Sequence, residues 1–449
     1  MATGESTQVF KKENWQECQS SVQSTFLYLY HSKVLSDVVF LIEDEDKRQK
    51  QFFAHKFFLS ARSAIFQSLF SCNNDAEIRI SDISSQGFET MLRFLYTDGI
   101  NLTSVQQAID AFRAAKKYGL PFMEKQCQDY ISSRITTESV CQIYELICKT
   151  EMSKILYECL VIISENPTKV FKSAGFIHCQ LSTILMIVKR SNMALTSEYN
   201  LFTAIVNWSR EECIRQNLDI ENNLRNIIKP LLPHIRFLTM YPYEYAKIID
   251  DTNLFDTSEA YAILLKILIP KATISLPKYL NCKLTPRNFL RYFTCRPFLS
   301  RNREPTETLK ENDAFGVTFQ ILKSDIFILG ITLSVLQQSR YIQKSELRTI
   351  IQIKLSSAKK SEEYLTEMKL NKYREPFLAF PYPVLIKEGE TVNIKAQIQN
   401  VDKLAPMSIY RYQELVSKFR QNDAEFIFDY DNILETRETY QISSLHYYI

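Results

Sequence analysis

The chain has 449 residues, enough for two to four domains, and 45% of them are hydrophobic, enough to bury ordinary cores. Its formal net charge of +3 predicts no general attraction to polyanions or to membrane surfaces. We expect no signal peptide, because Met1–Thr7 carries neither a basic nor an apolar run, and no membrane span, because Lys266 interrupts the most apolar stretch, Tyr261–Ile269.

The ten cysteines are spread along the chain without a Cys-x-x-Cys pair, and the last of them is Cys295. This spread predicts reduced, mostly buried thiols rather than a disulfide framework. We therefore expect a cytoplasmic protein, with the nucleus left open as a second location.

The N-terminal stretch is expected to be disordered over residues 1–10 and helical over Lys11–Lys33. Within that helix, apolar residues recur at intervals of three and four, as on one face of a helix. These residues are Trp15, Cys18, Val22, Phe26 and Leu29. Two interpretations stay open: the helix packs on its own domain, or it pairs two copies of the chain.

A small mixed domain is predicted next. Val38–Ile42 and Gln51–Ala54 are short apolar runs around a charged loop, which is typical of a hairpin. Ser84 or Ser85 is placed to cap a helix whose apolar residues Phe88, Met91, Leu92 and Leu95 follow helical spacing. Pro121 is placed to open another helix.

These residues resemble a BTB (POZ) domain, here expected over residues 11–134. The resemblance rests on Ser36–Phe40 (Ser-Asp-Val-Val-Phe), on Ala-His-Lys ending at Lys56, and on Phe-Leu-Tyr-Thr-Asp ending at Asp98. The residues Asn14-Trp-Gln just upstream restrict this resemblance to one branch of the family. In that branch, a BACK domain and a PHR-type β-sandwich follow the BTB domain.

The resemblance implies a homodimer. In the family, the N-terminal helix lies across a two-fold axis, so Trp15, Val22, Phe26 and Leu29 are the expected interface residues. Asp37 and Lys56 match a charged pair near the floor of that interface, and such a pair can fix how two copies align.

The resemblance also implies binding of cullin-3 by a helix ending near Phe70, the loop after it and the end of the helix that contains Tyr96. Phe70 and Tyr96 match the family positions and are the expected cullin-binding residues. The loop Ser71–Glu77 departs from the family pattern, because no large apolar residue precedes Glu77. A domain that only dimerises stays an alternative.

Residues 135–271 change to helical periodicity, with Ser197 or Thr196 placed to cap a helix over Leu201–Cys213. That helix resembles the central helix of a BACK domain, whose helical hairpins act as a spacer. Residues 272–313 are predicted to be a basic linker leading into the next domain. Basic residues with interleaved aromatic residues, as in Lys271–Arg303, can also bind single-stranded nucleic acid, which we consider the weaker interpretation.

In residues 314–449, apolar and polar residues alternate along several segments, which is typical of strands. This pattern predicts an antiparallel β-sandwich. The order of strands resembles a PHR domain, although the family is glycine-rich where this chain has Ser334-Val-Leu-Gln-Gln. Lys359–Arg374 is expected to be a helical or disordered insertion. The resemblance implies that loops of this domain, Ser334–Ser339 first among them, bind a protein substrate that the sequence does not identify. The predicted fold class is therefore a multidomain α+β chain.

Motifs for chemistry are absent from the sequence. The eight glycines are isolated, so they build no phosphate-binding loop, and the five histidines are far apart and away from paired cysteines. We expect no cofactor, no metal and no catalytic residues, and interpret His55 as a core histidine. Three classes compete: a cullin-3 substrate adaptor, a dimeric scaffold or transcription regulator, and an enzyme. The motifs favour the adaptor.

Overall fold

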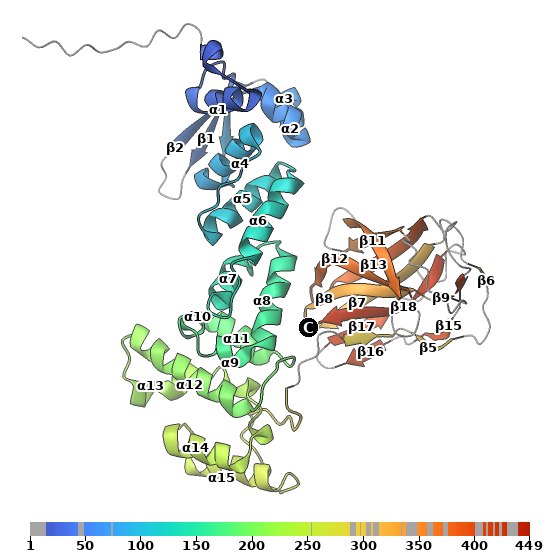
Figure 1. Ribbon diagram of the computed structural model, residues 1–449. Helices are drawn as coiled ribbons and strands as arrows, with labels where there is room; N and C mark the ends of the chain where they lie inside the picture. Colours follow the sequence, from blue (N-terminus) through green and yellow to red (C-terminus); the bar gives the residue numbers. More distant parts are fainter. Residues whose placement is uncertain are drawn as a thin grey trace, which may run out of the picture. The chain divides into compact units, whose positions relative to one another are not determined.

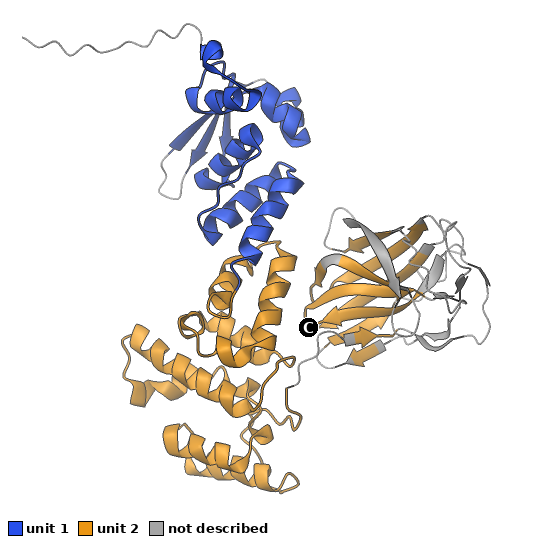
Figure 2. Cartoon of the chain, viewed as in Figure 1, with its two compact units in different colours: residues 1–135 blue, residues 136–449 orange. Residues whose placement is uncertain are grey.

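The structure is a computed structural model that describes two compact units, Met1–Ile135 and Thr136–Ile449, each considered by itself below (Figure 2). It describes residues 15–449 except for 44–48, 73–74, 253, 288–292, 297, 302–306, 309–313, 334, 338–347, 357–361, 371–375, 400–406, 410–411, 416–417, 422–423 and 429–438. The segment 1–10, expected to be disordered, lies outside the described residues.

The first unit is a three-stranded sheet with helices around it (Figure 1). The sheet has the order β2-β1-β3, with β1–β2 antiparallel and β1–β3 parallel. Its strands are β1 (Val38–Glu43), β2 (Gln49–Ala54) and β3 (Glu77–Ile80). Its helices are α1 (Val22–Ser32), α2 (Lys56–Arg62), α3 (Ala64–Cys72), α4 (Ser85–Thr97), α5 (Val105–Lys117) and α6 (Pro121–Ser132).

Local signals at the helix starts act as the sequence predicts. Ser84 caps α4, its Oγ accepting a hydrogen bond from the backbone N–H of Gly87 at 3.1 Å. Pro121 occupies the first turn of α6. Gly87 is required by packing: a Cβ there would lie 2.5 Å from the carbonyl oxygen of Asp110, so the start of α4 touches the backbone of α5.

The N-terminal helix is shorter than predicted. A 3₁₀ turn over Trp15–Cys18 precedes α1, which begins only at Val22. The break has a local cause, because Ser21 and Ser24 form a capping box in which each side chain accepts a hydrogen bond from the other's backbone N–H. The prediction of one continuous helix over Lys11–Lys33 is wrong.

The second unit begins with helices stacked as hairpins (Figure 1). They are α7 (Val140–Ile147), α8 (Ser153–Glu165), α9 (Pro167–Val170), α10 (Ala174–Ile177), α11 (Leu181–Lys189), α12 (Glu198–Arg215), α13 (Ile220–Ile228), α14 (Pro242–Thr252) and α15 (Thr257–Leu268). Ser197 caps α12 as predicted, accepting from the N–H of Tyr199. On the same helix, Trp208 is buried and donates from Nε1 to the carbonyl of Cys179 at 2.9 Å.

The rest of the second unit is a β domain. One sheet has the order β16-β17-β7-β13-β10-β11-β12-β8-β18-β4, and β7 also pairs with β18. These strands are β4 (Phe293–Cys295), β7 (Ala314–Lys323), β8 (Ile326–Leu333), β10 (Arg348–Leu355), β11 (Glu362–Leu370), β12 (Pro376–Ile386), β13 (Thr391–Gln399), β16 (Lys418–Gln421), β17 (Ala424–Phe428) and β18 (Thr439–Tyr448).

The sheet closes on itself, because β7 and β18 meet and β11 joins β10 to β12. All these pairings are antiparallel except β7–β18, which is parallel. Apolar side chains fill the space that the closed sheet surrounds, among them Phe315, Phe319 and Tyr447, each 0% exposed. The predicted α+β fold class with a C-terminal antiparallel β domain is confirmed.

Three expectations for this domain need correction. Glu362–Leu370 is strand β11, not a helical or disordered insertion. Phe293–Cys295, placed in the linker by the sequence, pairs with β18 inside the β domain. Val335–Gln337, expected to be loop, forms β9 and pairs with β14 (Met407–Ile409); the rest of Ser334–Ser339 lies outside the described residues.

Within the second unit, helix α8 packs against the β domain. Tyr448 of β18 is 0% exposed, and its hydroxyl donates to the carbonyl of Leu160 at 3.3 Å. Tyr157 of α8 contacts the rings of Phe327 and Tyr448. Arg190, just after α11, places its guanidinium over Tyr448 and donates to the carbonyl of Ile449 at 2.8 Å.

Candidate protein-interaction surfaces

An exposed apolar face lies on α1, on the connection after it and on α2. Val22, Leu35 and Phe57 are 68%, 72% and 78% exposed, and we call them the Phe57 face. Helix α1 adjoins α2, because Phe26 contacts Phe58 with ring centroids 4.5 Å apart. The connection adjoins the start of α2, because the carbonyl of Val34 lies 2.8 Å from Nε2 of His55. Apolar side chains this exposed on neighbouring segments are typical of an interaction surface.

The predicted dimer residues differ in how much surface they offer. Val22 is largely exposed, and Phe26 is half-buried against Phe58. Trp15 is half-buried and stacks on Tyr28, with ring centroids 4.8 Å apart. Leu29 is only 7% exposed, so it packs on its own domain and has little surface left for a partner.

Asp37 and Lys56 are in contact, although in a different way from the expected charge pair. The carboxylate of Asp37 accepts a hydrogen bond from the backbone N–H of Lys56 at 2.7 Å, at the start of α2. The ammonium group of Lys56 lies 5.7 Å from the centroid of the Phe70 ring. Asp37 thus fixes the connection before β1 to the start of α2.

Phe70 and Tyr96, the two expected cullin-binding residues, lie in different environments. Phe70 is half-buried at the end of α3 and stacks on Phe66, with centroids 5.9 Å apart. Tyr96 is 3% exposed, so its ring belongs to the core of the unit and offers almost no surface to a partner. Of the two, only Phe70 has an accessible edge.

Tyr96 is held by His55, which is 7% exposed. The hydroxyl of Tyr96 accepts from the backbone N–H of His55 at 3.0 Å and lies 2.6 Å from its Nδ1. Because Nε2 lies 2.8 Å from the carbonyl of Val34, Nε2 carries the proton and the Tyr96 hydroxyl donates to Nδ1. Burial raises the pKa of Tyr96 far above its usual value. His55 is thus a core histidine with both ring nitrogens bonded, as predicted.

A second exposed apolar surface joins α3 to the start of α6. Ile65 is 48% exposed and Phe122 is 62% exposed; we call these two residues the Ile65 surface. Gly119 lies between them: a Cβ on it would be 3.6 Å from Cγ1 of Ile65, and it lines a hollow of ≈290 Å³ together with Phe122. Arg62 forms an ion pair with Asp98 at the edge of the same hollow.

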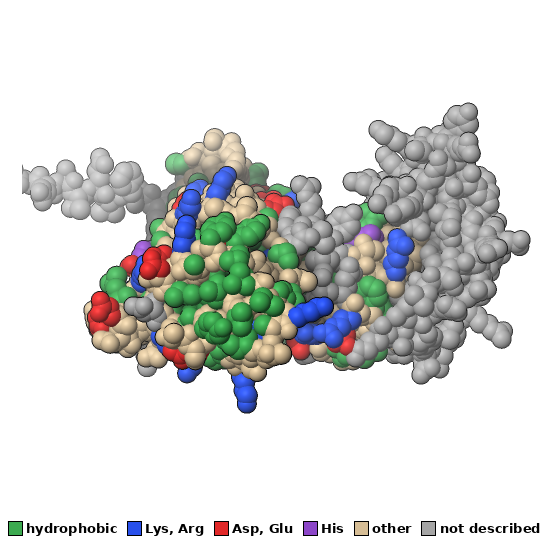
Figure 3. Space-filling view, turned by 90° about the horizontal axis from the view of Figure 1, so that it is seen from below, with side chains coloured by type: hydrophobic (Ala, Val, Ile, Leu, Met, Phe, Trp, Pro, Cys, Tyr) green, Lys and Arg blue, Asp and Glu red, His purple; other side chains and the backbone are tan. Residues whose placement is uncertain are grey.

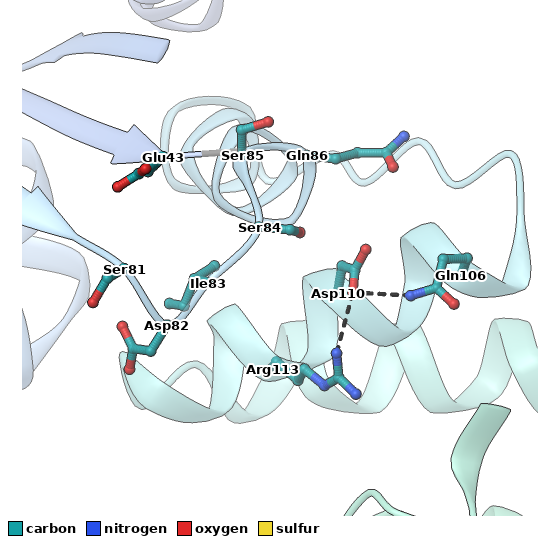
Figure 4. Close-up of a pocket in the computed structure, with 10 residues that line it drawn as sticks. All are labelled: Glu43, Ser81, Asp82, Ile83, Ser84, Ser85, Gln86, Gln106, Asp110 and Arg113. Atoms are coloured by element: carbon teal, nitrogen blue, oxygen red, sulfur yellow. Dashed lines mark hydrogen bonds and ion pairs between the residues drawn. The ribbon is translucent and has the colours of Figure 1, made fainter. Parts of the chain in front are cut away.

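A polar hollow of ≈990 Å³ lies in the first unit where β1 and β3 end beside α5 (Figure 4). Asp110 accepts from Gln106 at 3.1 Å and pairs with Arg113 at 3.5 Å. Asp82 pairs with Lys117 at 2.6 Å, and that hydrogen bond lowers the pKa of Asp82. These carboxylates are engaged within the chain, and we assign no chemistry to the hollow.

Two further kinds of feature concern the described residues, metal-binding groups and membrane-spanning helices. No group of three or more histidine, cysteine or acidic side chains there could hold a metal ion. No helix in the described part is long and apolar enough to cross a membrane.

Sequence reasoning missed Phe57, Leu35, Ile65 and Phe122. A signal for Phe57 exists, because Phe57, Phe58 and Leu59 are consecutive on a short helix and cannot all face one core. Leu35 has φ = +60°, a backbone conformation that apolar patterns do not reveal.

The fold consists of a mixed α/β domain, a set of helical hairpins and a β domain. Residues 26–135 match the family model described as "BTB/POZ domain", and residues 140–242 match the one described as "BTB And C-terminal Kelch", the BACK domain. The chain therefore contains a BTB/POZ domain followed by a BACK domain, as the sequence motifs indicate.

Curated relatives extend the match. "BTB/POZ domain-containing protein 6" of Xenopus laevis is 26% identical over 344 residues, covering 75% of this chain and 63% of that protein. "BTB/POZ domain-containing protein 3" of Homo sapiens is 25% identical over 256 residues, covering 56% of this chain and 48% of that protein. A solved structure, "BTB domain of zebrafish PATZ1", is 23% identical, covers 28% of this chain and 98% of its own, and has a TM-score of 0.22.

The chain thus spans less than two thirds of the length of these relatives. An alignment that covers 75% of the chain cannot be contained in residues 1–271, so it extends into the β domain. The relationship therefore involves more than the two matched domains.

Proposed function

We propose that this protein is a non-catalytic substrate-recognition adaptor of a cullin-3 RING ubiquitin ligase. The observation that carries the proposal is the order of the matches, a BTB domain followed directly by a BACK domain. In this role, the chain dimerises through the Phe57 face, binds cullin-3 with another part of the first unit, and recruits a protein substrate with the β domain.

The dimer in this proposal uses the apolar residues that are most exposed among those the structure describes in the first unit. Phe57 alone is 78% exposed, and a large aromatic side chain that becomes buried is a common energetic anchor of interfaces. Two copies of the adaptor offer two substrate sites, which raises the effective concentration of substrate beside the ligase.

We place the cullin contact on the Ile65 surface together with the accessible edge of Phe70. Ile65 and Phe70 lie on α3, which the family resemblance implicates, and Phe122 extends the apolar area onto α6. This replaces Tyr96, whose ring is buried, as the expected aromatic anchor.

Calorimetric titration of the full chain with the N-terminal domain of cullin-3 tests this function. We expect binding in the micromolar range or tighter, weakened about tenfold or more by Ile65→Glu and by Phe122→Glu, since ~1.4 kcal/mol is one decade. Ile214→Glu is the matched control, because Ile214 is 55% exposed on α12 of the second unit.

The second candidate is a BTB-dimerised scaffold or transcription regulator without cullin binding. It is favoured by one observation, the loop after α3, which has no large apolar residue before Glu77. Absence of heat in the titration would retire the ligase proposal and leave the scaffold. Salt-dependent binding of the full chain to DNA would favour the regulator.

We extend the proposal to a cytoplasmic location, with the nucleus as the second compartment. It is supported by the ten cysteines, all of which are free thiols, since reducing compartments keep thiols unpaired. Imaging of a tagged full-length chain tests it, and a secreted product would contradict it.

A further inference from the structure

The helical hairpin α14–α15 leaves a large apolar face uncovered within the second unit. Its residues Tyr241, Tyr243, Tyr261, Leu268 and Ile269 are each 53–61% exposed, and we call them the Tyr261 face. Tyr241 and Tyr243 stack on each other, with centroids 5.7 Å apart and planes 12° apart. Figure 3 shows hydrophobic side chains gathered over this end of the unit, with charged side chains of both signs around them.

Helix α15 carries two apolar stripes. One faces inward and includes Ala260 and Ile263, which are buried against the rest of the hairpin stack. The other consists of Tyr261, Leu264, Leu265 and Leu268, at positions i, i+3, i+4 and i+7. That spacing is the pattern by which a helix packs on another helix. In stacked helical hairpins, an outer hairpin that ends the stack normally has a polar face. The face of α15 therefore fits a helix as its partner.

The charges around the stripe indicate which helix. The exposed Asp256 lies at the N-terminal end of α15, whereas Lys266 and the exposed Lys271 lie at or beyond its C-terminal end. Glu259, also near the N-terminal end, is already paired with Arg225 at 2.8 Å. A helix from a different protein that carries charges of one sign only would be repelled at one end of α15. A second α15 that runs antiparallel places its acidic end beside the basic end of the first, and the two helix dipoles also oppose each other favourably.

We propose that the Tyr261 face is a self-association surface, on which α15 of a second copy of this chain packs antiparallel around a two-fold axis. The five side chains offer on the order of 500 Å² per copy, against ~800 Å² in a standard stable interface. The contact is therefore expected to be weak, and to become populated where copies are concentrated. It is independent of the Phe57 face, which belongs to the first unit.

Sedimentation of the full-length chain at rising concentration tests the proposal in four forms: wild type, Phe57→Glu, Leu268→Glu and the double variant. Leu268 is 56% exposed, so its substitution leaves the fold intact, and circular dichroism verifies this. We expect Phe57→Glu to keep a concentration-dependent association that Leu268→Glu weakens by about tenfold or more, because it places unpaired charges in the contact. Tyr261→Glu should act in the same way, and Ile214→Glu should change nothing.

The outcomes separate the two faces. If the mass of Phe57→Glu does not fall when Leu268→Glu is added, the Tyr261 face is not a self-association surface, whatever the state of the first unit. If wild type and Leu268→Glu have the same mass at every concentration, the proposal is also overturned and the face is left for a different protein. Cullin-3 titration of Leu268→Glu is expected to match wild type, so failure of the ligase proposal would not affect this result.

Discussion

Arg287 and Glu198 form a buried ion pair across 89 residues of sequence, with Nη2 2.8 Å from Oε1 and side chains only 1% and 2% exposed. Both groups are bonded further. Arg287 donates to the carbonyls of His234 and Arg190, and Glu198 accepts from the backbone N–H of Arg236 at 3.0 Å. The pair fastens the segment after α15 to the start of α12, so part of the predicted linker is fixed within the second unit.

Removing one partner of this pair should be costly. We expect Arg287→Met to lower the free energy of unfolding by about 3–5 kcal/mol, because it leaves the Glu198 carboxylate buried and uncompensated. The double variant Glu198→Gln/Arg287→Met should recover much of that loss. Arg79→Met is the control, because Arg79 pairs with Glu77 at 3.7 Å on an exposed surface. Denaturant unfolding measures all three, and equal effects of Arg287→Met and Arg79→Met would refute the role of the pair.

Gly87 offers a test of how closely α4 and α5 pack. Gly87→Ala places a Cβ 2.5 Å from the carbonyl oxygen of Asp110, so we expect a loss of roughly 1–3 kcal/mol as the helices move apart. Gly99→Ala is the matched control, since its nearest neighbour would be 3.5 Å away. Thermal unfolding of the two variants should separate them clearly. A melting temperature for Gly87→Ala equal to that of Gly99→Ala would contradict the close packing.

Tyr448 tests the contact between α8 and the β domain. Tyr448→Ala empties a fully buried site and should lower the free energy of unfolding by about 3–5 kcal/mol. Tyr448→Phe loses only the hydrogen bond to Leu160 and should cost about 1 kcal/mol. Unfolding curves and limited proteolysis report the difference. Similar behaviour of the alanine and phenylalanine variants would mean that the ring does not hold the contact.

His446 predicts a pH dependence of the β domain. Burial, with a smaller contribution from Arg296, lowers the pKa of His446 to about 4, and its Nε2 lies 2.8 Å from the hydroxyl of Thr332. The unfolded chain binds a proton below pH ~6.5 while the folded domain stays neutral. Stability from this group is therefore full above that pH and falls as the pH drops to about 4.

The difference between wild type and His446→Gln isolates this effect. We expect the stability advantage of wild type over the variant to shrink between pH ~6.5 and about 4, and to stay constant above pH ~7. His31→Gln, at an exposed position of α1, serves as the control. A difference curve for His446→Gln that is flat across this range would rule out the buried neutral histidine.

Local features were predictable from the sequence, and tertiary ones were not. Helix starts depend on a few neighbouring residues, so the local sequence reveals them. This holds for the caps at Ser84 and Ser197 and for the start at Pro121. The partner of Arg287 is 89 residues away, and nothing in a basic, proline-containing stretch distinguishes it from exposed arginines. The sequence of β11 is rich in charged residues, which do not favour a strand. It is a strand in the structure because it pairs with β10 on one side and β12 on the other.

The candidate surfaces show the same limit. The family resemblance assigned Phe70 and Tyr96 to one contact surface, but packing within the unit leaves Phe70 half-buried and Tyr96 buried. Phe57 and Phe122 look like core residues in the sequence because phenylalanine usually is buried. In the structure they are 78% and 62% exposed.

The position of β18 in the sheet affects the order in which the parts of this chain can fold. In the first unit, β1 finds β2 and β3 within a short stretch of chain. In the β domain, β18 must meet β4, β7 and β8, and the bond between Ser443 and Thr332 alone closes a loop of 111 residues. Closing such long loops slows folding. The first unit can therefore complete its fold while β18 still has to pair, and during that interval the unpaired strand edges of the β domain are prone to aggregation.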